Sequence, residues 1–253
     1  MITWGQVVGA LALVVVAIGL SVWRSVRIEN EIAWAVFRSF VQLIALGYVI
    51  KLIFEAGNVA WVVPMLGVMV FFGALTARNR APGVPNAFLL LLVSITAAVL
   101  ATLGLALAVG AIHANARTLI PVGGMVIGQA MVSSGLALSR LEFEIGSAAR
   151  EIEARLSLGA SWRQASDPIV RRSVTAGMIT TIDATKTAGL VAIPGTTVGM
   201  LLGGAAPLDA VRLQLILFYL LLGATAIVVV LVTTSAARGF FTPAHQLREL
   251  EAT

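Results

Sequence analysis

The sequence predicts an all-α membrane protein with about seven transmembrane helices. Of its 253 residues, 59% are hydrophobic and only 11% are charged. Soluble domains carry roughly 25% charged residues, so this composition belongs to a polytopic membrane protein. The apolar residues also run in stretches of about 20. That is the length at which a helix rising about 1.5 Å per residue crosses a hydrocarbon core about 30 Å thick.

Seven segments are long and apolar enough to be spans. They comprise residues 2–23, 33–50, 59–77, 87–112, 119–139, 187–206 and 211–234. The first segment is followed, not preceded, by basic residues, so it should remain as a span and not be removed as a signal peptide.

Positive charges predict the orientation of these spans, because basic residues favour cytoplasmic loops. With the amino terminus outside and the carboxyl terminus in the cytoplasm, the inner segments hold Arg24, Arg27, Arg38, Arg78, Arg80, Arg140, Arg150, Arg155, Arg163, Arg171, Arg172, Arg238 and Arg248. The outer segments hold only Lys51, Arg117 and Arg212. This distribution explains the high pI of about 10.7 without a nucleic-acid partner. It also places the polar loop 139–174 in the cytoplasm.

Several chemistries lack the residues that they need. Cysteine is absent, so disulfides, thiolate metal sites and cysteine nucleophiles are excluded. Neither lysine, Lys51 or Lys186, follows a glycine, so the chain has no P-loop of its own for ATP. The spans contain no carboxylate cluster with the spacing of metal ligands, and a metal site stays unassigned.

The polar loop carries the most informative motif. Glu153-Ala154, Gly159 and Ile169 reproduce the Glu-Ala-x4-Gly-x9-Ile spacing of permease loops that dock onto ABC ATPases. Residues 148–158 favour a short amphipathic helix, since they contain no Gly or Pro and are rich in Ala, Glu, Arg and Leu. A solvated loop with incidental helicity is the alternative interpretation.

A glycine should end this short helix. Gly159 tolerates a positive φ just past the helix end, and a second segment should begin near Ser161. The short helix, the glycine turn and the return helix would form a rigid protrusion that a soluble ATPase subunit could contact. The residues assigned to this ATPase coupling are Glu151, Glu153, Ala154, Arg155, Leu158 and Gly159.

Polar side chains within or beside the spans are candidates for the transport path, because such groups are costly in lipid. Asp183 and Lys186, at i and i+3, can meet on one helix face. They would form either a structural ion pair at the cytoplasmic interface or an internal gate. Gln42 and Gln129 would either line a polar path or hold helices together. Residues 194–195, Pro-Gly, should kink or break the sixth span.

Three stretches give the chain a family resemblance. They are Val41-Gln42-Leu43-Ile44 with Gly47-Tyr48-Val49, Leu156-Ser157-Leu158-Gly159-Ala160, and the run Thr181-Ile182-Asp183-Ala184-Thr185-Lys186-Thr187-Ala188-Gly189-Leu190-Val191-Ala192-Ile193-Pro194-Gly195. With them the chain resembles the bacterial iron-export ABC permease family of the FetB or YbbM type, and plant aluminium-tolerance permeases are similar. The resemblance extends to Phe240-Phe241, over essentially the whole chain.

This resemblance implies a single permease domain over residues 1–253 in the bacterial inner membrane, exporting iron or a related metal species. It also implies a homodimer of permeases with two separate ATP-binding subunits. Those subunits would bind ATP and Mg, and this chain would hold no cofactor.

The chain departs from the family pattern at four positions. Thr196 and Thr197 stand where the family often has two methionines, so the soft thioether ligands are missing at that point of the path. Gln129 replaces an asparagine, and Arg172 stands where the docking motif usually ends in proline. The general permease interpretation is unaffected by these changes.

Other functions remain open on the sequence. The permease could carry a non-metal solute such as a nucleotide sugar. A polytopic enzyme acting on lipids would need a cluster of catalytic side chains at one depth, for which only Asp183 and Lys186 are candidates. A passive channel or an assembly factor would have no need for the docking motif.

Overall fold

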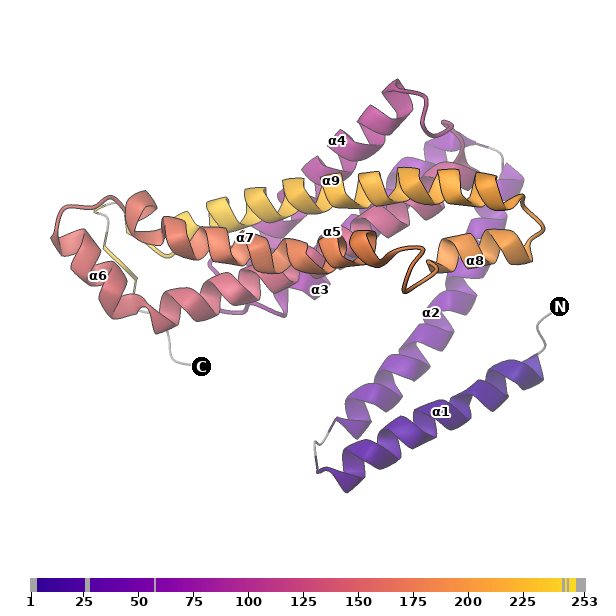
Figure 1. Cartoon of the computed structure of the whole chain (residues 1–253), viewed down its shortest axis with the longest axis horizontal. Helices are drawn as coiled ribbons and strands as arrows, with labels where there is room; N and C mark the ends of the chain where they lie inside the picture. The colour runs from indigo at the N-terminus through magenta and orange to yellow at the C-terminus, as the bar shows by residue number, and fades with distance from the viewer. Residues whose placement is uncertain (1–3, 26–27, 57, 243, 245, 249–253) are drawn as a thin grey trace. The chain divides into compact units, whose positions relative to one another are not determined.

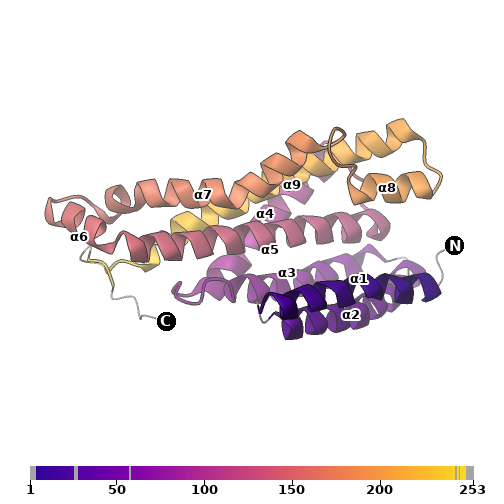
Figure 2. The same ribbon diagram turned by 60° about the horizontal axis from the view of Figure 1, so that its bottom comes forward.

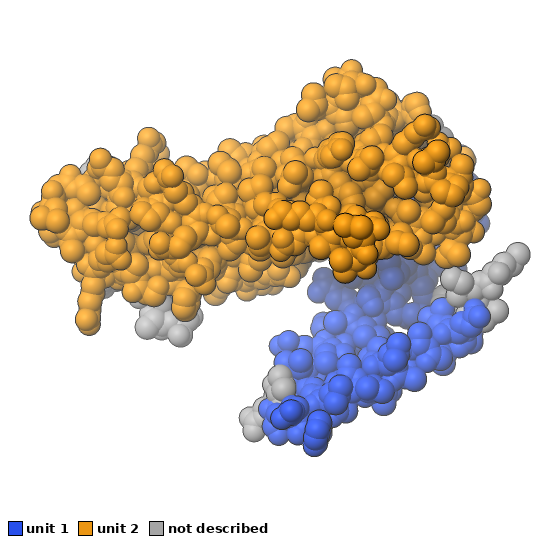
Figure 3. Space-filling model, in the orientation of Figure 1, with its two compact units in different colours: residues 1–58 blue, residues 59–253 orange. Residues whose placement is uncertain are grey.

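The computed structural model describes residues 4–25, 28–56, 58–242, 244 and 246–248. The predictions that fall on Ile2 and Arg27 lie outside these residues. Within the described part, the chain is helical apart from turns and two isolated β-bridges, which confirms the all-α prediction. Its contacts divide it into two compact units, residues 1–58 and 59–253 (Figure 3).

The first unit consists of α1 (Trp4–Trp23) and α2 (Glu29–Ala56). The turn between them is held by Ser21, whose hydroxyl donates to the Glu29 carboxylate at 3.2 Å and accepts from the Ile28 amide at 3.2 Å. Most other side chains of both helices are exposed within this unit. Such apolar surfaces suit contact with lipid or with another helix.

The second unit contains the remaining helices (Figures 1 and 2). These are η1 (Val59–Trp61), α3 (Val62–Arg78), α4 (Ala87–Ala108), α5 (Ala116–Ser147), α6 (Ala149–Ser157), α7 (Trp162–Thr187), α8 (Gly195–Leu202) and α9 (Pro207–Gly239). Helices α5, α7 and α9 pack against one another, and α3 and α4 complete the bundle. The short helices α6 and α8 lie at opposite ends of α7 (Figure 1).

Small residues let the central helices approach closely. At Gly177 of α7, an added Cβ would lie 2.8 Å from the Ala137 side chain of α5, 2.9 Å from the Val229 side chain of α9 and 3.0 Å from the Ser133 carbonyl oxygen. Real Cβ atoms essentially never come within 3.0 Å of another side chain, so glycine is required where the three helices meet.

Six helices of the described residues are long and apolar enough to cross a membrane. They cover Gly5–Trp23, Glu29–Glu55, Val59–Arg78, Ala87–Ala108, Ala116–Ser147 and Pro207–Gly239. The chain is therefore a multi-pass helical membrane protein.

The prediction of one continuous span over residues 187–206 is wrong. Helix α7 ends at Thr187, where that span should have begun, and the chain then turns before α8 starts at Gly195. The segment that takes the chain from the α6 end of the bundle to the other end is α7, whose 26 residues correspond to about 39 Å. Helix α7 carries several charged residues and is not among the six helices apolar enough to cross a membrane.

Candidate functional site

The loop between α5 and α7 folds into a short helix, as the sequence predicts. Helix α6 covers Ala149–Ser157, close to the expected 148–158. Its Ile152 is only 1% exposed and packs inward, so the apolar face of α6 anchors it to the rest of the chain. Glu153 and Ala154 are exposed, and Arg155 pairs with Glu151 at 2.6 Å, which leaves the polar face accessible.

A left-handed glycine ends α6. Gly159 has φ of +90°, its amide donates to the Leu156 carbonyl at 3.0 Å, and the Ala160 amide donates to the Arg155 carbonyl at 3.1 Å. These two bonds define a Schellman motif, which confirms the predicted role of the glycine. The turn leaves Leu158 89% exposed at the tip of the loop.

The return helix begins with a capping box. The Ser161 hydroxyl accepts from the Gln164 amide, and the Gln164 side chain accepts from the Ser161 amide at 2.9 Å. This reciprocal cap satisfies amide groups that the first turn of α7 would otherwise leave open. The end of α6, Gly159 and the start of α7 are therefore each determined by residues close in sequence, and together they form a compact helix–turn–helix segment.

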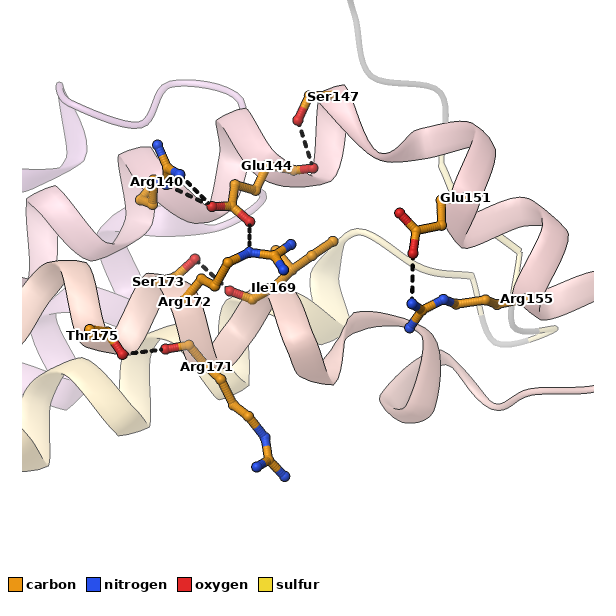
Figure 4. A network of polar contacts seen from close by, with 10 residues as sticks. All are labelled: Arg140, Glu144, Ser147, Glu151, Arg155, Ile169, Arg171, Arg172, Ser173 and Thr175. Carbon is orange, nitrogen blue, oxygen red and sulfur yellow. Dashed lines mark hydrogen bonds and ion pairs between the residues drawn. The ribbon is translucent and has the colours of Figure 1, made fainter.

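A buried carboxylate joins the end of α5 to the start of α7 (Figure 4). The Glu144 side chain is 7% exposed and accepts from Arg140 at 2.7 Å and from Arg172. Arg172 is the residue that replaces the expected proline of the docking motif. At this interior position of α7 a proline would kink the helix, whereas Arg172 makes a charged contact that ties α7 to α5. The motif residue Ile169, 3% exposed, lies in the core beside this contact.

Asp183 and Lys186 lie at the end of α7 that is remote from α6. They are 21 and 24 residues beyond Trp162, which corresponds to about 30–36 Å along the helix. They therefore lie far from the docking loop, and the interpretation as a structural ion pair at the cytoplasmic interface, which would link that loop to the next span, is wrong. The predicted side-by-side ion pair is also absent from the described residues, and both side chains are exposed.

A buried polar network crosses the middle of the bundle. The Gln129 side-chain amide of α5 donates to the Thr181 hydroxyl of α7 at 2.7 Å and to Ser133 at 3.1 Å. Thr181 also shares a hydrogen bond of 3.2 Å with Thr225 of α9. Of the two roles left open for Gln129, the structure thus shows helix-to-helix contact.

The Pro-Gly pair marks a helix start and not a kink within a span. Pro194 is the N-cap residue of α8, and Gly195 is the first residue of that helix. The next two residues, Thr196 and Thr197, donate to one oxygen of Gln214 in α9, at 2.8 and 3.2 Å. Gln214 is 8% exposed, so α8 is docked on α9 through a shielded polar contact.

Gln42 belongs to α2 in the first unit and is exposed there, whereas Gln129 belongs to the second unit. Among the described residues, no group of three or more His, Cys, Asp or Glu side chains is arranged to hold a metal ion.

Sequence reasoning missed the residues whose roles depend on distant partners. Glu144, Thr181, Gln214 and Thr225 each contact another helix, and Gly177 lies at a three-helix crossing. Only the i, i+4 spacing of Arg140 and Glu144 gave a usable signal.

The fold and the site define a polytopic helical membrane protein with a helix–glycine–helix loop at one end of its bundle. Comparison with known proteins shows that the chain belongs to the uncharacterised protein family UPF0014, whose model matches residues 4–241. No solved structure matches the chain significantly.

Three relatives illustrate the range of the family. The UPF0014 membrane protein STAR2 of Oryza sativa subsp. japonica is 36% identical over 96% of this chain and 85% of its own length. The probable iron export permease protein FetB of Escherichia coli (strain K12) is 34% identical over 94% of this chain and 92% of its own. The protein ALUMINUM SENSITIVE 3 of Arabidopsis thaliana is 35% identical, over 96% and 90%. The predicted family resemblance is confirmed.

Proposed function

We propose that this chain is the membrane-spanning permease subunit of an ATP-driven transporter, and that a separate ATP-binding subunit supplies ATP and Mg. The observation that carries the proposal is the α6–Gly159–α7 unit, which is short, rigidly capped at both junctions and exposed at Leu158. An exposed apolar tip flanked by charges suits a soluble protein partner. One relative bears the name of a permease, which agrees with transport.

The coupling would be mechanical. A displacement of α6 passes directly into α7, because only residues 158–161 separate the two helices. The Glu144–Arg172 contact transmits part of this motion to α5. At the other end, α7 stops at Thr187 and the chain turns before Pro194, so a shift of the helix would alter this turn and α8.

The assembly would contain two permeases and two ATPase subunits in the bacterial inner membrane, with α6 in the cytoplasm. The arginine distribution supports this orientation. The first candidate substrate is iron or a related metal species, from the name of the Escherichia coli relative. A non-metal solute such as a nucleotide sugar is the alternative. Either would contact the exposed charges at the α8 end of α7.

Two glycines allow the docking role to be tested with a matched control. Gly159 and Gly110 both have positive φ, of +90° and +70°, with open space around an added Cβ, and both end a helix with the same pair of hydrogen bonds. Gly159→Val and Gly110→Val should therefore strain the backbone similarly. Only the first lies in the loop assigned to the ATPase.

The experiment measures ATP hydrolysis by the complex in lipid, together with co-purification of the ATPase subunit. Gly159→Val should reduce both, while Gly110→Val should leave ATPase binding intact at a similar thermal stability. Equal loss in both variants, or none, would refute the docking role. Titration with Fe(II), Fe(III) chelates, other metals and UDP-glucose then separates the substrates: stimulation by iron alone supports iron export, and stimulation by UDP-glucose alone rejects it.

A further inference from the structure

A cavity of about 540 Å³ opens at the α6 end of the bundle, next to but separate from α6 itself. Its walls come from the turn before α4, the first residue of α7, the last turn of α9 and the segment that follows it. The lining residues are Pro85, Asn86, Leu90, Trp162, Ser235, Arg238, Gly239, Phe241, Thr242 and Arg248. This volume is in the range of small-molecule sites, which is about 300–1,000 Å³.

The cavity is basic. Arg238 and Arg248 line it, no Asp or Glu does, and neither arginine forms an ion pair within the described residues. Other arginines at this end, such as Arg140, Arg171 and Arg172, are paired with carboxylates of the chain. The cavity therefore brings together two arginines whose charge no carboxylate of the described residues compensates.

Backbone hydrogen bonds hold the second arginine in place. The Arg248 amide donates to the Phe240 carbonyl at 2.9 Å, and Thr242 donates its amide to the Gln246 carbonyl at 2.8 Å. This turns the segment after α9 back on the helix end, beside the buried Phe240 and Phe241. The Trp162 ring lies against Phe241, with ring centroids 6.0 Å apart and planes tilted by 36°, and both residues line the cavity.

The remaining walls offer hydrogen-bond donors and an open helix end. Ser235 and Thr242 contribute hydroxyl groups. Asn86, the N-cap residue of the 22-residue helix α4, has φ of +54°, and its side chain makes no hydrogen bond to the first turn of that helix. An uncapped helix N-terminus favours a negative charge. Pro85 and Leu90 add an apolar wall beside these polar groups.

We infer that this cavity binds a phosphate ester, held by the guanidinium groups of Arg238 and Arg248. Two planar guanidinium groups suit the oxygens of a phosphate, which they can contact in pairs. The phosphate could belong to the headgroup of an anionic lipid or to a soluble metabolite. Under the orientation proposed above, the cavity lies at the cytoplasmic headgroup level, where basic pockets between helices bind anionic lipids.

The test uses the full-length protein without any ATPase, so its outcome does not depend on the transporter proposal. Binding of phosphatidylglycerol and of cardiolipin is measured in nanodiscs of phosphatidylcholine, by native mass spectrometry and by thermal shift. Glycerol phosphate and inorganic phosphate are titrated in parallel. Binding of the lipids alone identifies a headgroup site, and binding of the soluble phosphates identifies a metabolite site.

Variants assign the binding to this cavity. Arg238→Gln with Arg248→Gln should weaken it about 30-fold, as expected from the loss of two basic contacts. Arg78→Gln with Arg150→Gln removes two exposed, unpaired arginines outside the cavity and should change binding less than about threefold. Arg238→Lys with Arg248→Lys keeps the charge but loses the paired guanidinium contacts, so it should recover only part of the affinity; partial recovery shows that the first variant is not merely misfolded.

Equal weakening in the cavity variant and in the control would mean a general surface charge effect and would overturn the inference. So would an absence of binding of both lipids and soluble phosphates to the wild-type protein.

Discussion

In the half of α7 next to α6, Arg171 and Arg172 pair with carboxylates of the chain, whereas at the end next to α8 Asp183 and Lys186 are exposed and form no ion pair in the described residues. At the first end the carboxylates of Asp167 and Glu144 hold Arg171 and Arg172 in place, so we expect this part of α7 to be rigid. The second needs water, a solute or another subunit, because unpaired charges are costly in lipid. Helix α7 thus links an end at which arginines are paired within the chain to an end whose charges need water, a solute or another subunit as a partner.

This contrast assumes that α7 is held firmly between its two ends. Gly177→Val would insert a side chain where an added Cβ already lies 2.8 Å from Ala137 and 3.0 Å from the Ser133 carbonyl. We expect the largest loss of stability here, about 3 kcal/mol, since backbone would have to move. Thermal unfolding in detergent measures it, with Gly128→Val, where an added Cβ meets nothing within 4 Å, as the control. An equal loss in the two variants would contradict the close crossing.

The rigid end can be weakened by removing its central charge. Glu144→Gln should cost about 2 kcal/mol, because a buried carboxylate that holds two arginines becomes neutral. Glu151→Gln, which breaks an exposed pair on α6, should cost no more than about 0.5 kcal/mol. Denaturant unfolding of both variants checks the difference. A larger loss of stability in Glu151→Gln than in Glu144→Gln would show that Glu144 is not the main charge that stabilises this end of α7.

The polar network in the middle of the bundle should matter less. Gln129→Leu removes donors to Thr181 and Ser133, while Thr181 and Thr225 still bond to each other. We expect a loss of about 1 kcal/mol, typical of a hydrogen bond between membrane helices. Adding Thr181→Val to Gln129→Leu should cost less than the sum of the two single changes. Strict additivity would show that the residues act independently.

Substitutions at the end of α7 next to α8 should have the smallest effect on stability. Asp183→Asn and Lys186→Gln should each change unfolding by less than about 0.5 kcal/mol, because both side chains are exposed and unpaired. If this end contacts the transported solute, solute-stimulated ATP hydrolysis should fall about tenfold in Asp183→Asn, as expected for one lost charged contact. A large loss of stability with normal stimulation would instead mean that these charges have structural partners.

The docking loop was predictable because its signals are local. A run without Gly or Pro and a glycine at the helix end are read within about a dozen residues, and α6, Gly159 and the return helix after Ser161 appear where expected. The same is true of most spans, whose apolar length is a property of the segment alone. The family, too, was recognisable from contiguous stretches of sequence.

The path of the chain after the loop was decided by tertiary contacts. Hydropathy favoured residues 187–206 as a span and did not favour α7, because it scores each polar residue without regard to its hydrogen-bond or ion-pair partners on other helices. In the folded chain, Thr181 bonds to Gln129, 52 residues away, and Arg172 bonds to Glu144, 28 residues away. The sequence by itself therefore determined the apolar helices, the capped loop and the family. Only the folded structure determined that α7 continues through the bundle, because its polar groups are satisfied by partners on other helices.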